Sequence, residues 1–126
     1  MTALRYTTDS FSEEKFRNCG KMVAVVMNYN KKGMIGRAVE SAFDQDYPCY
    51  EILAMDDASN DGSEKEMVES VKACIAKYRD KALRVTVIVN ETNLTTLGQW
   101  REAVNSSDGE WFGMFCGDDL SMRRRM

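Results

Sequence analysis

The sequence contains no histidine, and its four cysteines are widely separated. Cys19, Cys49, Cys74 and Cys116 form no CxxC pair, so neither a zinc site nor a disulfide framework is indicated. We interpret them as four reduced thiols, which is typical of a cytoplasmic protein. The sequence also has a single proline, Pro48, which marks the connection before the apolar segment 52–55.

Long apolar runs are absent as well. No segment is apolar over enough residues to span a bilayer, and the polar N-terminus lacks the apolar core of a secretory signal. The 17 basic and 20 acidic residues give a net charge of -3, which provides no global attraction to nucleic acid or to an anionic membrane. We therefore expect a soluble, cytoplasmic protein that binds no nucleic acid, with peripheral membrane contact left open.

Short apolar segments alternate with amphipathic ones along most of the chain. Strands are predicted at residues 22–27, 52–55, 84–89 and 110–116, and helices at about 33–43, 63–80 and 95–106. This alternation predicts an α/β fold, in which a parallel sheet carries helices on both faces. We expect residues 1–21 to form an irregular N-terminal arm with one short helix near 12–17, and residues 22–126 to form the domain.

Polar residues follow each predicted strand at the point where it ends. They are Asn28, Tyr29 and Asn30, then Asp56 and Asp57, then Asn90 and Asn93, and finally Asp118 and Asp119. Ligands bind outside the carboxyl ends of open parallel sheets, so we expect these side chains to converge on one crevice. Two acidic pairs repel each other unless a cation or a hydrogen-bond donor compensates them. Hard oxygen ligands without histidine favour Mg²⁺ or Mn²⁺.

A structural interpretation of the same residues stays open. Asparagines at strand ends are more often turn formers than ligands. Asp56 can equally well accept hydrogen bonds from backbone amides of its own loop. For Asp57 and Asp119, contact with a ligand is the favoured interpretation.

Four segments, in this order, resemble the family 2 glycosyltransferases. They are the strand end Asn28-Tyr29-Asn30, the segment 41–48 (SAFDQDYP), the segment 51–62 (EILAMDDASNDG), and Gly109-Glu110-Trp111 followed by Gly117-Asp118-Asp119. The resemblance spans about 22–120 and implies a Rossmann-like GT-A fold that binds nucleotide-diphospho-sugars. It covers the donor-binding half, and the domain is expected to be incomplete at the C-terminus.

The resemblance also implies roles for individual residues. Tyr29 would stack on or flank the base, with Asn30, Asp56 and Asn93 nearby in the donor site. Asp57 would accept a hydrogen bond from the base's ring N–H, which favours uracil. Asp118 would hydrogen-bond the ribose, and Asp119, with Asp118, would bind the Mn²⁺ or Mg²⁺ that bridges the diphosphate. The implied reaction is transfer of a sugar, with inversion, to the hydroxyl of a carbohydrate or lipid-linked acceptor.

No residue after Asp119 offers a carboxylate that could act as the base for the acceptor hydroxyl. The sequence therefore names no catalytic residue and leaves an alternative open: a non-catalytic nucleotide-sugar-binding module or a truncated pseudo-transferase. A phosphoacceptor receiver domain is disfavoured, because the first strand ends in Asn28-Tyr29-Asn30 and not in an acidic pair. The last strand is expected to be an unpaired sheet edge, which favours a homodimer.

Overall fold

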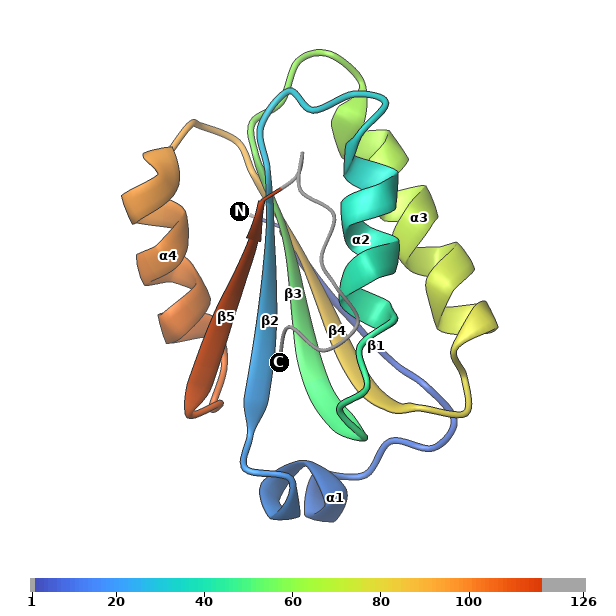
Figure 1. Cartoon of the computed structure of the whole chain (residues 1–126). Helices are drawn as coiled ribbons and strands as arrows, with labels where there is room; N and C mark the ends of the chain where they lie inside the picture. Colours follow the sequence, from blue (N-terminus) through green and yellow to red (C-terminus); the bar gives the residue numbers. More distant parts are fainter. Residues whose placement is uncertain (1, 117–126) are drawn as a thin grey trace.

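A computed structural model describes residues 2–116. They form a five-stranded sheet in the order β1-β4-β3-β2-β5 (Figure 1). The strands are β1 (Thr2–Thr7), β2 (Met22–Asn28), β3 (Cys49–Asp57), β4 (Ala82–Asn90) and β5 (Trp111–Cys116). The helices are α1 (Glu13–Asn18), α2 (Ile35–Phe43), α3 (Ser63–Lys77) and α4 (Thr95–Ser106).

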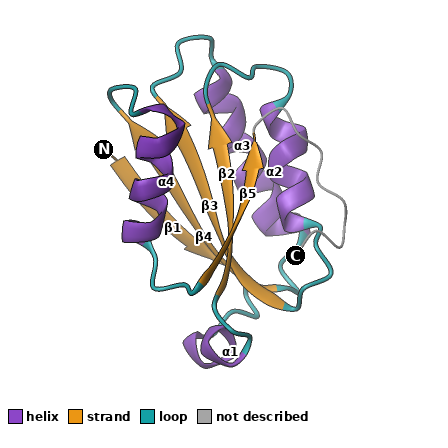
Figure 2. Cartoon of the chain, turned by 60° about the vertical axis from the view of Figure 1, so that its left-hand side comes forward, coloured by secondary structure: helices purple, strands orange, loops and turns teal. Residues whose placement is uncertain are grey.

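The predicted parallel sheet with helices on both faces is confirmed. β2, β3, β4 and β5 run parallel, with β3 between β2 and β4. Helices α2 and α3 cover one face and α4 covers the other, as the two views show (Figures 1 and 2). Every residue of β3 is buried, because the central strand has neighbours on both sides and helices on both faces.

Residues 2–7 are not the irregular segment that the sequence predicted. They form β1, which pairs antiparallel with β4 from Thr2↔Val89 to Thr7↔Arg84. The side chain of Tyr6 packs against the core under α3, and the Thr8 hydroxyl accepts a hydrogen bond from the Leu83 amide at 2.9 Å. The mixed composition of TALRYT concealed this strand from a search for apolar runs. The short helix expected nearby is confirmed as α1.

Two apolar layers fill the space between the sheet and its helices. The layer under α2 and α3 includes Ile35, Phe43 and Met67, all fully buried. The opposite layer includes Phe16 of α1 and Ala103 of α4. The fold therefore holds the strand ends in a rigid frame and leaves the loops at those ends to carry function.

β5 lies at one side of the sheet and pairs only with β2 in the part of the chain that the structure describes. The homodimer expected from this edge stays a prediction. None of the helices within residues 2–116 is long and apolar enough to cross a membrane.

Candidate functional site

The polar strand ends gather at one edge of the sheet, as predicted for the described residues. Asn28 at the end of β2 stands opposite Asp56 of β3, and Asp57 stands opposite Asn90 at the end of β4. The loops that leave these strands form the upper edge of the molecule in Figure 1. Asp118 and Asp119 lie outside the described residues, so their predicted roles stay predictions.

Asp56 is held by donors of its own loop and of the neighbouring strand. Its carboxylate accepts hydrogen bonds from Asn28 Nδ2 at 2.7 Å, the Ser59 amide at 3.0 Å and Ser59 Oγ at 2.6 Å. The residue is 1% exposed. These donors compensate the buried charge, as the structural interpretation of Asp56 requires.

Asn30 joins the β2–α2 loop to the β3–α3 loop. Its amide donates to Ser59 Oγ at 2.9 Å, and its Oδ1 accepts the Asn60 amide at 2.9 Å. Asp61 adds a second bridge, because its carboxylate accepts the Lys32 amide at 3.1 Å. Asn30 thus builds the rim of the site through both its backbone and its side chain.

Asp57 points to the other face of the sheet and meets the start of α4. Its Oδ1 accepts the Leu94 amide at 2.7 Å, and its Oδ2 accepts the Thr95 amide at 3.0 Å. Asn90 Nδ2 approaches Oδ1 at 3.3 Å. The N-cap residue Leu94 has no capping side chain, and the first turn of α4 is capped by this carboxylate from β3. A negative charge at a helix N-terminus is favourable, which explains the arrangement.

Asn93 lies in the same corner. Its Oδ1 accepts the Thr95 amide at 2.9 Å, and its Nδ2 approaches the Asp57 carbonyl at 3.4 Å. The side chain is therefore a turn former in this arrangement, which is the structural alternative that the sequence left open.

The loops at this edge contain strained backbone. Asn30 has φ 53°, Ala58 has φ 63° and Thr95 has φ 68°. Asparagine tolerates the left-handed region, but alanine and the β-branched threonine do so at a cost of about 1–2 kcal/mol each. Strained residues persist where the surroundings over-determine them, and they cluster at functional sites.

Tyr29 is a predicted site residue whose side chain is open to a ligand: 45% of it is exposed. Its position beside Asn28 and Asn30 places it at the carboxyl edge of β2. An exposed aromatic ring at a ligand-binding edge offers a flat apolar surface of the kind on which a base can stack.

No group of three or more acidic, cysteine or histidine residues that could hold a metal occurs within residues 2–116. Asp56 and Asp57 are both engaged by donors, so they are poor candidates for metal ligands here. Any metal site that involves the acidic pair Asp118 and Asp119 lies outside the described residues.

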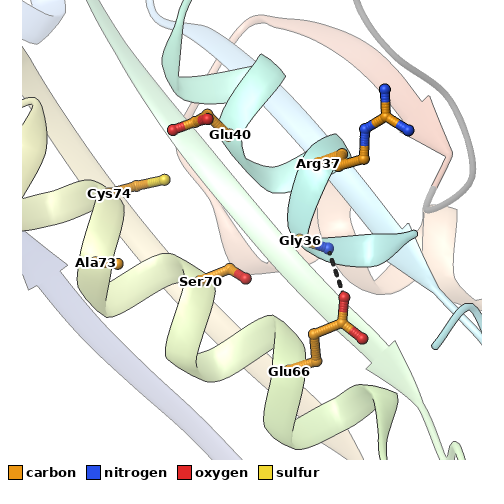
Figure 3. A pocket seen from close by; sticks show the side chains of 7 residues that line it. All are labelled: Gly36, Arg37, Glu40, Glu66, Ser70, Ala73 and Cys74. Atoms are coloured by element: carbon orange, nitrogen blue, oxygen red, sulfur yellow. Dashed lines mark hydrogen bonds between the residues drawn. The ribbon is translucent and has the colours of Figure 1, made fainter. Parts of the chain in front are cut away.

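Sequence reasoning missed two contributors to this region. Ser59 bridges the loops through its hydroxyl, as described above. Glu66 of α3 accepts the amides of Gly33 at 2.7 Å and Gly36 at 3.2 Å, and so caps α2 from a neighbouring helix (Figure 3). Spacing within the sequence gives no signal for these long-range contacts, because they depend on how distant loops and helices come together in the fold.

A groove of about 320 Å³ lies between α2 and α3, and Figure 3 shows its lining. It is bordered by Arg37, Glu40 and Ser70 among others, and none of the predicted site residues in the described part lines it. The groove therefore adjoins the strand-end region through the α2 cap formed by Gly36 and Glu66.

The sequence profile of the family described as glycosyl transferase family 2 matches residues 23–125. The chain belongs to this family. A curated relative, "Putative glycosyltransferase EpsE" of Bacillus subtilis (strain 168), is 32% identical over 110 residues, which are 86% of this chain and 37% of the relative. The family 2 chain described here thus spans little more than a third of that relative.

Solved structures support the same family and the GT-A fold. S. aureus TarS 1-349 in complex with UDP is 30% identical to this family 2 chain, with a TM-score of 0.63 over 82% of this chain and 29% of TarS 1-349. The mannosyltransferase PcManGT from Pyrobaculum calidifontis, in complex with GDP-Man and Mn²⁺, is 24% identical, with a TM-score of 0.64 over 79% of this chain and 28% of PcManGT. The second likeness is one of fold alone.

Proposed function

We propose that this chain is the donor-binding part of a family 2 glycosyltransferase. The donor is a nucleotide-diphospho-sugar, with UDP as the nucleotide, and the sugar passes with inversion to the hydroxyl of a carbohydrate or lipid-linked acceptor. The observation that carries the proposal is the position of Tyr29 and Asp57 at the carboxyl ends of the adjacent strands β2 and β3, in a GT-A sheet whose sequence matches the family over 23–125. The UDP bound to the similar TarS structure supports the choice of nucleotide.

The described residues have different roles in donor binding. Tyr29 supplies an exposed ring against the base. Asp57 supplies a carboxylate that can accept the N–H of uracil, since a buried acceptor selects for a ligand that carries a matching donor. Asp56 and Asn30 do not touch the donor in this proposal and instead fix the loops that frame it.

The cofactor proposed is Mn²⁺ or Mg²⁺. Asp118 and Asp119 would hold the ion, because the carboxylates of Asp56 and Asp57 are already engaged. A bound divalent ion would neutralise charge on the departing nucleoside diphosphate. The GDP-Man and Mn²⁺ in PcManGT, a protein with the same fold, are consistent with this choice.

Calorimetric titration of the purified chain with UDP tests the proposal. We expect binding in the presence of Mn²⁺, much weaker binding in EDTA, and loss of the metal-dependent part in Asp119→Ala. The matched control is Asp80→Ala, which removes an exposed carboxylate after α3, at the end of that helix away from the strand ends. GDP serves as the competitor that tests the preference for uracil.

Two outcomes would change the proposal. Absence of binding to any nucleoside diphosphate would refute the donor site. We expect the chain alone to bind donor and metal more readily than it transfers sugar. UDP binding without transfer to any acceptor tested would favour the alternative of a nucleotide-sugar-binding module.

A further inference from the structure

The carboxylate proposed to recognise the base is already occupied by the protein itself. Both oxygens of Asp57 accept backbone amides from the start of α4, Leu94 at 2.7 Å and Thr95 at 3.0 Å. The Asp57 residue is only 1% exposed. A base that uses this carboxylate must therefore share it with α4 or displace α4 from it.

The acceptor capacity of the carboxylate shows that sharing is restricted. Each carboxylate oxygen can accept about two hydrogen bonds. Oδ1 already receives the Leu94 amide and, more distantly, Asn90 Nδ2. Oδ2 receives the Thr95 amide. One acceptor position therefore remains on Oδ2, but Asp57 is only 1% exposed, so we expect a donor from outside to reach the carboxylate only when the first turn of α4 moves away from it.

The α4 side of this contact is under strain. Thr95 has φ 68°, a conformation that β-branched residues rarely adopt. Its amide lies between two acceptors, Asp57 Oδ2 and Asn93 Oδ1. Leu94 has no such second acceptor among the hydrogen bonds of the described residues, so its amide depends on Asp57 alone.

We propose that Asp57 switches between two partners: the first turn of α4 when no donor is present, and the ring N–H of the base when donor binds. This inference rests on the proposed function and adds a conformational step to it. Donor binding releases the Leu94 amide and lets Thr95 leave the left-handed region. By linkage, any change that stabilises the contact between Asp57 and α4 weakens donor binding by the same factor.

Hydrogen exchange followed by NMR on the full chain gives the first test, with UDP and Mn²⁺ as the ligand. We expect the Leu94 amide to exchange at least severalfold faster in the presence of saturating UDP, with a smaller change at Thr95 because Asn93 remains as acceptor. Amides in the middle of the parallel sheet, such as Leu53, serve as the internal reference. Pyrophosphate with Mn²⁺ has no base and should leave Leu94 unchanged.

The outcomes separate this inference from the function on which it rests. Saturable UDP binding with unchanged or slower exchange at Leu94 would overturn the switch and leave the donor site intact. Failure of UDP to bind at all would overturn the proposed function itself. Faster exchange at Leu94 with pyrophosphate alone would show that the base is not the competing group.

A glycine substitution gives the second test. Thr95→Gly removes the strain of the left-handed conformation, stabilises the contact with Asp57, and should weaken UDP binding by about five- to thirtyfold, the equivalent of the usual strain. The control is Thr96→Gly, a neighbour in the same helix that is also exposed and has no positive φ. Equal UDP affinities for the two variants would overturn the role of strain in the switch.

Discussion

Arg84 of β4 stands directly opposite Glu51 of β3, and its Nε donates to Glu51 Oε2 at 2.9 Å. The Glu51 side chain is 0% exposed and that of Arg84 is 5% exposed. The same guanidinium reaches Glu13, the first residue of α1, at 2.9 Å and Asp108 before β5 at 2.8 Å. It also lies over the ring of Phe16, 4.7 Å from the ring centroid. One buried cation therefore joins the N-terminal segment and the α4–β5 connection to the centre of the sheet.

Removing the buried partner should destabilise the fold strongly. We expect Glu51→Ala to lower the free energy of unfolding by about 3–5 kcal/mol, because the buried Arg84 loses its one fully buried carboxylate partner among the described residues. Glu13→Ala is the matched control: the Glu13 side chain is 58% exposed, so its loss should cost no more than about 1 kcal/mol. Urea unfolding followed by circular dichroism measures both. Equal losses for the two variants would contradict the special role of Glu51.

The same cluster makes stability depend on acid. Burial alone raises the pKa of Asp108, but the hydrogen bond and charge of Arg84 outweigh it and hold the pKa below its ordinary value of 3.8. The pKa of Asp61 is also lowered, chiefly because the Ser63 hydroxyl donates to its carboxylate. A depressed folded pKa adds stability above the unfolded pKa and loses it as the pH falls through the folded value.

We therefore expect the urea midpoint to fall as the pH drops below about 4, within the range in which these carboxylates become protonated. Asp108→Asn should be less stable than the parent at pH 7 and should show a shallower fall toward acid pH, because its side chain no longer titrates. The effect is modest, since 61% of the Asp108 side chain is exposed. A parallel acid profile for the variant and the parent would rule out a contribution from this residue.

The sequence was sufficient for the parallel core because β2, β3 and β4 are nearly uninterrupted apolar runs separated by amphipathic helices. It was insufficient for β1, whose mixed segment TALRYT becomes a strand only because β4 offers an edge with which it can pair. Local composition does not reveal such a partner.

The candidate site, like the fold, was only partly predictable from the sequence. The convergence of strand ends follows from topology, so Asp56 and Asp57 could be placed at one edge from the sequence. Their different hydrogen-bond partners could not be predicted, because adjacent residues of a strand point to opposite faces and meet different elements. Asp56 meets Ser59 in its own loop, whereas Asp57 meets Leu94, which lies 37 residues further along the chain.

Substitutions at the rim should separate structure from binding. Asp56→Ala leaves the donors Asn28 Nδ2 and Ser59 N without their buried acceptor, and we expect it to cost about 2–4 kcal/mol of stability. Tyr29→Ala removes a side chain that is 45% exposed, so stability should change by less than about 1 kcal/mol. UDP affinity of Tyr29→Ala should nevertheless fall by about tenfold, the equivalent of losing one stacking contact.

Thermal unfolding and UDP titration measured on the same preparations check this pair. A Tyr29→Ala variant that binds UDP like the parent would remove the ring from the donor site. An Asp56→Ala variant that is as stable as the parent would show that its hydrogen bonds contribute no net stability.

Gly109 precedes β5 and is required for space alone. A Cβ built there would lie 2.2 Å from Val23 Cγ2 and 3.1 Å from the Lys21 carbonyl oxygen, and a buried, β-branched neighbour cannot rotate freely out of the way. We expect Gly109→Ala to destabilise the fold by about 2–3 kcal/mol through overpacking. Gly33→Ala is the contrasting control. The φ of Gly33 is 83° and a Cβ added there would have no neighbouring atom within 4 Å, so only about 1–2 kcal/mol of backbone strain is expected.

The reason for the glycine can be tested by a double-mutant cycle with Val23→Ala. This change removes the methyl group that a Cβ at position 109 would meet, so Gly109→Ala should cost clearly less in the Val23→Ala background than in the parent. Gly33→Ala should cost the same in both backgrounds, because its penalty comes from its own backbone. If Gly109→Ala were equally costly in both, the Lys21 carbonyl, which also accepts the Glu110 amide at 2.9 Å, would be the limiting contact.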